Sequence, residues 1–143
     1  MSTTHEIIHR PPVPAAASPA ALRVGVDIAR ASNVADAVAT FGDRYLGRIF
    51  TAREVAYALA APALAAERLA ARFAAKEAAI KAFDLSEAGV AWSDIEVLHA
   101  ESGACALVLH DRVQDLVAAS GVTDIALSLS HEGDYAIAFV AAR

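Results

Sequence analysis

The spacing of hydrophobic residues changes along the chain, and each change marks a predicted element. Residues 22–28 alternate apolar with small or polar positions and are rich in β-branched side chains, which predicts a strand with Asp27 near its end. Residues 65–83 predict a long helix, introduced by Pro62. Its large apolar residues recur on one face, at Leu69, Phe73, Ile80 and Phe83.

Shorter elements complete the pattern. Ser32 or Asn33 is expected to cap a helix that ends at Gly42, and the capping box Thr51-x-x-Glu54 opens another that runs to about Ala60. Asp111 is expected to cap a helix that ends near Gly121. Strands are predicted around residues 95–98, 105–109, 125–129 and 135–142, the last two joined by a tight turn at residues 132–134. The order predicts an α+β fold in which an antiparallel sheet packs against the long central helix.

Composition sets the size and class of the protein. With 143 residues, of which 57% are hydrophobic, the chain predicts one compact domain. Much of this fraction is alanine, which buries little area, so Leu, Ile, Val and Phe are expected to carry the core. Residues 1–21 are rich in Ser, Thr, Pro and Ala and predict a flexible extension, which leaves residues 22–143 as the folded domain.

Charge and cysteine content narrow the function classes. A formal net charge of −5 argues against general nucleic-acid binding, which depends on many Lys and Arg contacts to phosphates. No apolar run reaches the roughly 20 residues that span a bilayer, and no signal peptide is expected. Cys105 is the only cysteine, which excludes an internal disulfide and favours the cytoplasm.

One short motif near the N-terminus matches a zinc-site pattern. His5-Glu6-Ile7-Ile8-His9 has the letters of HExxH, in which two histidines one helical turn apart bind zinc. The segment has no helix start signal and runs directly into Arg10-Pro11-Pro12. We therefore interpret the match as a coincidence of letters.

Three places carry candidate chemistry. Asp27 is a carboxylate on an apolar strand, where either a cation neutralises it or it caps the following turn. Glu77 and Lys81 lie one helical turn apart, which suits either a solvent-exposed ion pair or a metal-bound phosphate site. The same helix carries a basic row able to hold phosphate oxygens, formed by Arg68, Arg72 and Lys76.

The third place is the end of the penultimate strand. Ser130 and His131 lie where the predicted hairpin turns, and imidazole can donate to a phosphate or assist proton transfer. A histidine in a turn can equally be structural or simply exposed. Together with the carboxylates, the oxygen-rich ligand set favours Mg²⁺ over zinc.

Four segments in this order resemble the holo-acyl-carrier-protein synthase family of 4′-phosphopantetheinyl transferases. They are GVDI, RFAAKEAAIKAF, WSDIEV and SLSHEGDYAIAFV, and the resemblance covers about residues 23–140. It implies the transferase fold and a Mg²⁺-dependent reaction in which coenzyme A gives its phosphopantetheine arm to a serine of an apo acyl carrier protein. The product is adenosine 3′,5′-bisphosphate, and the carriers serve fatty-acid or polyketide synthesis.

The resemblance also implies roles for residues. Asp27 and Glu77 would bind Mg²⁺, and Glu77 or a metal-bound water would take the proton of the carrier serine. Lys81 would be catalytic and, with Arg72, Lys76, Ser130 and His131, would hold coenzyme A. Short members of the family form homotrimers with each active site between two subunits. An acidic helix of the carrier would dock on a basic patch, for which the candidates are Arg30, Arg44, Arg48 and Arg53.

Two positions depart from the family pattern. Asn33 stands where an arginine usually faces the carrier, and Arg30 is the candidate to compensate. Residues 84–89 replace the usual glycine-rich turn near the cofactor. Two other functions stay open: a non-catalytic carrier-binding module with the same fold, and another Mg²⁺-phosphate enzyme such as a nucleotide hydrolase.

Overall fold

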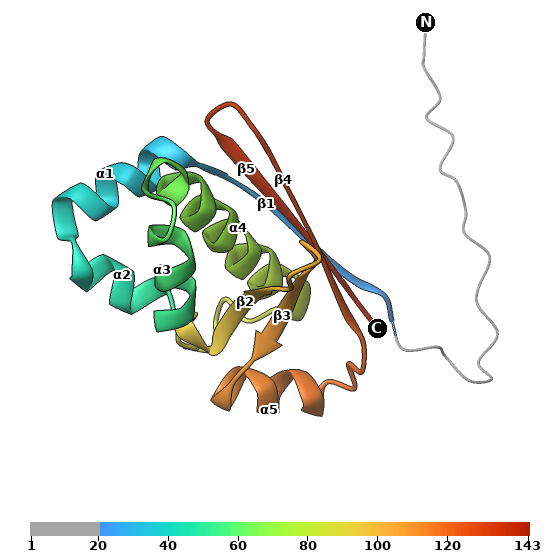
Figure 1. The fold of residues 1–143 in the computed structure, drawn as a ribbon. Coiled ribbons are helices and arrows are strands. Elements are labelled where there is room, and N and C mark those ends of the chain that lie inside the picture. Colours follow the sequence, from blue (N-terminus) through green and yellow to red (C-terminus); the bar gives the residue numbers. More distant parts are fainter. Residues whose placement is uncertain (1–20) are drawn as a thin grey trace, which may run out of the picture.

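The computed structural model describes residues 21–143 (Figure 1). The match to HExxH and most of the predicted extension lie outside the described residues. The elements in chain order are β1 (Arg23–Arg30), α1 (Ala31–Phe41), α2 (Asp43–Ile49), α3 (Ala52–Leu59), the 3-10 helix η1 (Pro62–Leu64), α4 (Ala65–Phe83), the 3-10 helix η2 (Trp92–Asp94), β2 (Ile95–His99), β3 (Cys105–Leu109), α5 (Asp111–Ala119), β4 (Ile125–Glu132) and β5 (Tyr135–Ala142).

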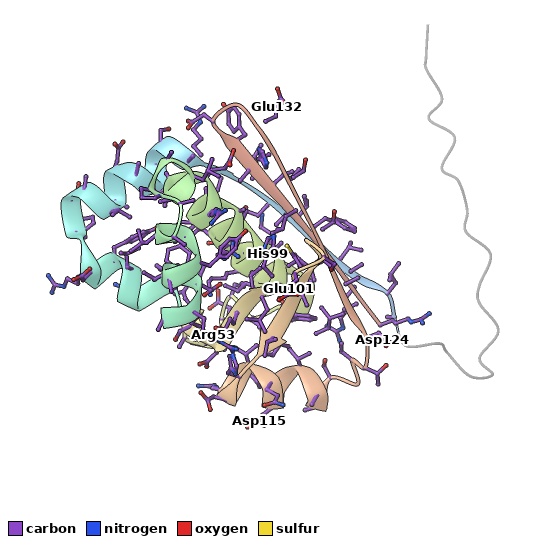
Figure 2. All side chains as sticks on the ribbon, viewed as in Figure 1. Arg53, His99, Glu101, Asp115, Asp124 and Glu132 are labelled. Carbon is purple, nitrogen blue, oxygen red and sulfur yellow. The ribbon has the colours of Figure 1, made fainter. Side chains whose placement is uncertain are left out.

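The main sheet is antiparallel with strand order β1-β5-β4. In Figure 2, Glu132 marks the tip of the β4–β5 hairpin and Asp124 the opposite end of β4. Helices α1 to α4 lie on one side of this sheet, and α4 crosses it directly (Figure 1). The predicted α+β fold, with an antiparallel sheet on a long central helix, is confirmed. A feature that the sequence did not predict is a second, separate sheet formed by β2 and β3.

Alanines of α4 form the centre of the core. Leu69 and Phe83 are buried as expected, but Phe73 and Ile80 are only half-buried. Large residues therefore share the core with alanine to a greater extent than expected, because small side chains let α4 approach the strands closely. The alanines buried along this helix are Ala70, Ala74, Ala75, Ala78, Ala79 and Ala82.

The N-terminus of α1 is capped from a distant part of the chain. Neither Ser32 nor Asn33 is the N-cap; Arg30 occupies that position and makes no capping bond with its side chain. Instead the Ser32 backbone N–H donates to Asp134 Oδ1 at 2.9 Å, and the Ser32 hydroxyl donates to the same carboxylate. Asp134 belongs to the hairpin turn, so this turn ties the end of the chain to its first helix.

Most other predicted boundaries agree with the structure to within a residue or two, but β4 runs to Glu132, three residues beyond its predicted end. The capping box of Thr51 and Glu54 is present, and Gly42 ends α1 with a φ of 56°. The helix expected to be capped by Asp111 has His110 as its N-cap and Asp111 as its first residue. Helix α2 was not predicted from the sequence. Across residues 21–143, no helix has the length and apolarity needed to cross a membrane.

Candidate active site

Close packing of α4 on β1 positions the first candidate residue. A Cβ added to Gly25 would lie 2.0 Å from the Ala78 carbonyl oxygen and 2.8 Å from the Ala82 nitrogen. Only glycine therefore permits this approach of helix to strand. Because side chains alternate along a strand, Asp27 lies on the same face of β1 as Gly25 and is directed toward α4.

Asp27 meets Lys81 of α4 in an ion pair. The Asp27 Oδ1 atom lies 3.2 Å from Lys81 Nζ, which also donates a hydrogen bond of 3.0 Å to the Val26 carbonyl oxygen. The Asp27 side chain is 18% exposed and that of Lys81 is 54% exposed. One interpretation of the sequence paired Lys81 with Glu77. In the structure the Lys81 amine pairs with Asp27 instead.

Glu77 lies beside this pair. Burial raises the pKa of the Glu77 carboxyl, the negative charge of Asp27 raises it further, and Lys81 opposes the shift. Two carboxylates and one ammonium leave a local excess of negative charge. A cation bound there would relieve the repulsion that raises the pKa of Glu77.

The donor set fits a hard, oxygen-binding metal ion. Within residues 21–143 no group of three or more His, Cys, Asp or Glu side chains is assembled into a metal site. Zinc sites in proteins use at least three such ligands. Mg²⁺ is commonly held by one or two carboxylates, with water and substrate phosphate oxygens as its other ligands. Asp27 and Glu77 are therefore suited to Mg²⁺ rather than to zinc.

A second candidate region lies nearer the N-terminal end of α4. Arg72, Ser130 and His131 line one cavity of about 320 Å³. The His131 Nδ1 atom lies 2.9 Å from Glu67 Oε1, which ties the hairpin to the first turn of the helix. Arg72 is buried, and its Nε–H has no hydrogen-bond partner within the described protein. The cavity thus offers cationic and hydrogen-bonding groups to an anionic ligand.

Three further residues that line this cavity, Tyr57, His99 and Cys105, were not predicted from the sequence. His99 stacks on Tyr57 with ring centroids 4.8 Å apart, and its Nδ1 atom lies 3.3 Å from Arg72 Nη2 and 3.3 Å from Cys105 Sγ. Burial lowers the pKa of His99, and the charge of Arg72 lowers it further. No spacing pattern links Tyr57, His99 and Cys105 in the sequence, because three different elements bring them together.

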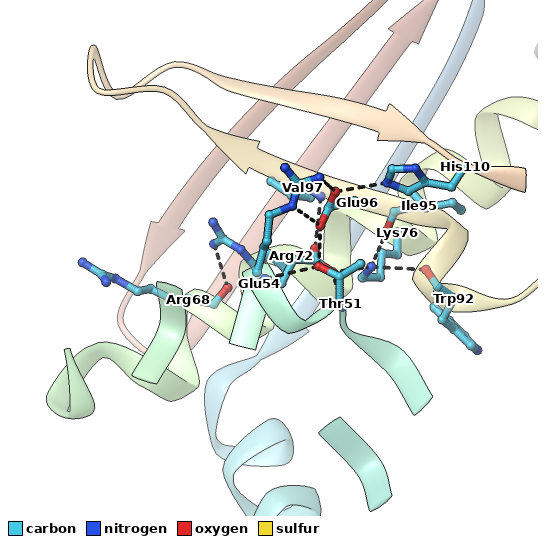
Figure 3. A network of polar contacts seen from close by, with 11 residues as sticks. Thr51, Glu54, Arg68, Arg72, Lys76, Trp92, Ile95, Glu96, Val97 and His110 are labelled. Carbon is cyan, nitrogen blue, oxygen red and sulfur yellow. Dashed lines mark hydrogen bonds and ion pairs between the residues drawn. The ribbon is translucent and has the colours of Figure 1, made fainter. Parts of the chain in front are cut away.

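Lys76 does not lie where the sequence placed it. Its side chain is fully buried, and its Nζ atom forms an ion pair of 2.8 Å with Glu54 Oε1 (Figure 3). The same amine donates to the carbonyl oxygens of Trp92 and Ile95. The expectation that Lys76 holds a phosphate is therefore corrected: α3 and β2 cover this side of α4, and the amine is fully occupied inside the protein.

Arg53 is also engaged within the protein. It forms a two-pronged ion pair with Glu96 of β2. The Glu96 carboxylate also accepts hydrogen bonds from Thr51 and His110 (Figure 3). Burial acts to raise the pKa of Glu96, but the hydrogen bonds from Thr51 and Arg53 bring it below its usual value. Arg53 thus stabilises the contact between α3 and β2.

The other three candidate docking residues line two neighbouring cavities. Arg44 and Arg48 line an apolar cavity of about 580 Å³ formed mainly by α2. Arg30 lines the next cavity together with Asn33, and its guanidinium lies 5.1 Å from the centre of the Tyr135 ring. Tyr45 contributes to both cavities. Arg30, the candidate to compensate for the arginine that Asn33 replaces, thus lines the same cavity as Asn33.

Comparisons with known proteins agree on one family. The family described as the 4′-phosphopantetheinyl transferase superfamily matches residues 23–140. A holo-[acyl-carrier-protein] synthase of Koribacter versatilis is 42% identical over 120 residues, which cover 83% of this chain and 95% of that protein. One of Moorella thermoacetica is 41% identical over 117 residues, which cover 82% of this chain and 90% of the relative.

Solved structures give the same answer. The ACPS–CoA complex from Chronobacterium ammoniagenes matches with a TM-score of 0.74 at 34% identity, covering 86% of this chain and 97% of that one. A holo-(acyl-carrier-protein) synthase from Bacillus anthracis in complex with CoA (3′,5′-ADP) matches with a TM-score of 0.65 at 27% identity, covering 84% of this chain and 94% of that one. Sequence and fold together show that the chain belongs to the 4′-phosphopantetheinyl transferase superfamily.

Proposed function

We propose that this protein is a Mg²⁺-dependent holo-[acyl-carrier-protein] synthase that transfers 4′-phosphopantetheine from coenzyme A to a serine of an apo acyl carrier protein. The observation that carries the proposal is the meeting of Asp27, Glu77 and Lys81, which lie far apart in the sequence. The relatives named holo-[acyl-carrier-protein] synthase support the reaction, and the CoA complexes among the similar structures support the donor. The single cysteine favours a cytoplasmic location.

The proposed reaction makes one bond and breaks one. The oxygen of the carrier serine attacks the phosphorus that bears the pantetheine arm, and the bond to adenosine 3′,5′-bisphosphate breaks. Bound Mg²⁺ would polarise the attacked phosphorus and neutralise the leaving phosphate. Lys81, which already lies beside Asp27, would donate to a phosphate oxygen. Glu77 would accept the serine proton, either directly or through a metal-bound water.

The nucleotide end of coenzyme A is assigned to the second cavity. Arg72, Ser130 and His131 line it, and the positive charge of Arg72 would attract a phosphate bound in the cavity. Along α4, Glu67 and Glu77 are separated by about 15 Å, from a rise of about 1.5 Å per residue. A site that uses His131 beside Glu67 and the carboxylate pair at Glu77 must therefore span that length or be completed by a second subunit.

An exposed apolar face supports a homotrimer with shared active sites. The side chains of Val24, Val26 and Ile28 point away from α4 and are 53%, 50% and 60% exposed. On the adjacent strand, Phe139 lies opposite Val26 and Ile137 opposite Ile28, with 44% and 40% of their surfaces exposed. A continuous apolar sheet face of this kind is typical of an interface between subunits.

The carrier is expected to dock on the basic cavities. Arg44 and Arg48 present charge around an apolar cavity, and Arg30 extends the patch. Such a surface complements an acidic helix that also carries apolar residues. Arg53 is left out of this surface because Glu96 already binds it.

The decisive test is transfer to a carrier. The purified protein is incubated with Mg²⁺, coenzyme A and an apo acyl carrier protein, and the carrier is followed by intact mass. We expect the mass to rise by one phosphopantetheine, and Glu77→Gln to slow transfer at least about 100-fold, since metal stabilisation of several kcal/mol is lost. Asp115→Asn, at an exposed carboxylate on α5, is the matched control and should transfer normally.

Two outcomes would redirect the proposal. Carrier binding without any mass gain, across several unrelated carriers, would favour a binding module with the same fold. Release of phosphate from nucleotides without a carrier would favour a hydrolase. The trimer is tested by light scattering after chromatography, where Phe139→Asp should yield a smaller species, because the charge disrupts the apolar face.

A further inference from the structure

Trp92 is the only tryptophan of the chain and is held from two directions. Its ring stacks on Phe73 of α4, with centroids 5.3 Å apart and planes inclined by 16°. Its carbonyl oxygen accepts a hydrogen bond of 3.2 Å from Lys76 Nζ, which is itself fixed by Glu54. The indole is thus held against α4 and is still half-buried rather than enclosed.

Trp92 lines two cavities of different character. One is the apolar cavity of about 580 Å³ with Arg44 and Arg48 among its lining residues. The other, of about 260 Å³, contains Glu77 and is walled mainly by apolar side chains. The remaining residues of this smaller cavity are Ile80, Leu85, Ser86, Gly89 and Val90. The indole therefore forms a wall shared by the basic surface and the Glu77 cavity.

The chemistry of the proposed reaction assigns an occupant to the smaller cavity. The phosphorus that is attacked lies at Glu77, and the pantetheine arm is bonded to that phosphorus, so the arm extends from this point. Ile80, Leu85 and Val90 suit its methyl and methylene groups, and Ser86 can bind one of its amides. The carrier would approach from the arginine side, so its serine and the arm would both pass close to Trp92.

We propose that Trp92 is a positioning residue: Phe73 covers one face of its ring, and the remaining face and edges contact the pantetheine arm in the smaller cavity and the docked carrier at the larger one. The inference rests on the proposed function and goes beyond it, because it links two binding events through one side chain. A ligand that fixes the indole makes the second ligand easier to bind, which is a reciprocal coupling between the sites. The affinity for apo carrier should therefore rise when the arm of coenzyme A is in place.

The fluorescence of Trp92 tests this proposal directly, since no other tryptophan contributes. Emission is recorded with Mg²⁺ and either coenzyme A or adenosine 3′,5′-bisphosphate, which has the same nucleotide end and no arm. Calorimetry measures binding of each ligand under the same conditions. We expect coenzyme A to change the emission and the bisphosphate, although bound, to leave it nearly unchanged. Equal changes with both ligands, or binding of coenzyme A without any change, would overturn the proposal.

Variants separate positioning from folding. Trp92→Leu should raise the KM for coenzyme A roughly tenfold while the Kd for the bisphosphate stays the same, because only the arm loses a contact. Trp92→Phe keeps a ring against Phe73 and should restore most of the KM. A damaged fold would weaken both ligands together, and that result would refute the positioning role. Failure of coenzyme A to bind even the unaltered protein would instead overturn the proposed function together with this inference.

Discussion

Substitution of Lys76 by methionine separates a structural lysine from a phosphate ligand. Methionine approximately fills the volume of the lysine stem, so the main loss is the charge that neutralises Glu54. Both side chains of the pair are fully buried, and removal of one partner of such a pair costs about 3–5 kcal/mol. Glu54 keeps hydrogen bonds from the backbone N–H groups of Thr51 (2.9 Å) and Val97 (3.0 Å), which stabilise the remaining carboxylate.

The loss does not end with the ion pair. The carbonyl oxygens of Trp92 and Ile95 also lose their donor, which costs about 1 kcal/mol each. This cost offsets the stabilisation that the Glu54 carboxylate keeps from its two backbone hydrogen bonds. We therefore expect a total of about 3–5 kcal/mol. At roughly 3–5 °C per kcal/mol for a domain of this size, Tm should fall by about 10–20 °C.

The assay is thermal unfolding by circular dichroism at one fixed protein concentration, because an oligomer's Tm depends on concentration. Lys81→Met is the matched control: it lies on the same helix, its side chain is 54% exposed, and its loss should cost less than about 1 kcal/mol. The double variant Glu54→Gln/Lys76→Met should recover part of the stability. A Lys76→Met protein with unchanged Tm and a sharply raised KM for coenzyme A would refute the structural role.

Three further predictions concern the packing, the hairpin turn and the carboxylate pair. Gly25→Ala should destabilise the protein by at least about 1–3 kcal/mol in urea unfolding, because the new methyl overlaps the Ala78 carbonyl oxygen. The control is Gly47→Ala in the middle of α2, where a new methyl meets no atom within 4 Å, and it should be neutral or stabilising. The hydrogen bonds from Ser32 lower the pKa of Asp134, so their stabilising effect is complete above the ordinary Asp pKa and is lost as pH falls through the lowered pKa. Asp134→Ala should therefore lower Tm at pH 7. A difference in Tm that persisted in acid would contradict this. Burial and Asp27 raise the pKa of Glu77, so ionisation of Glu77 destabilises the metal-free protein as pH rises from the ordinary Glu pKa through the raised pKa. In EDTA at neutral pH, Glu77→Gln should therefore unfold at a higher temperature than the unaltered protein. The difference should disappear in acid.

Local signals in the sequence were sufficient for most of the elements, α2 excepted, and for part of the site. The long helix was predicted over residues 65–83, and α4 has those bounds, because alanine-rich periodicity and Pro62 act within a few residues. The capping box at Thr51 is equally local. The resemblance of the GVDI and KEA segments brought Asp27 and Glu77 forward as partners before any geometry was known. Their roles as metal ligands remain predictions.

Contacts between distant segments could be decided only by the tertiary structure. Lys76 and Arg72 appeared to continue a basic surface row, but α3 and β2 cover that side of the helix and convert the row into buried pairs and a cavity wall. Asp134 replaced Ser32 as the cap of α1 because the hairpin turn folds back onto it, across 102 positions of sequence. The spacing of apolar residues indicates which face of a helix is apolar, but it contains no information on what packs against the other face. Burial of that face decides whether a lysine binds a substrate or an internal carboxylate.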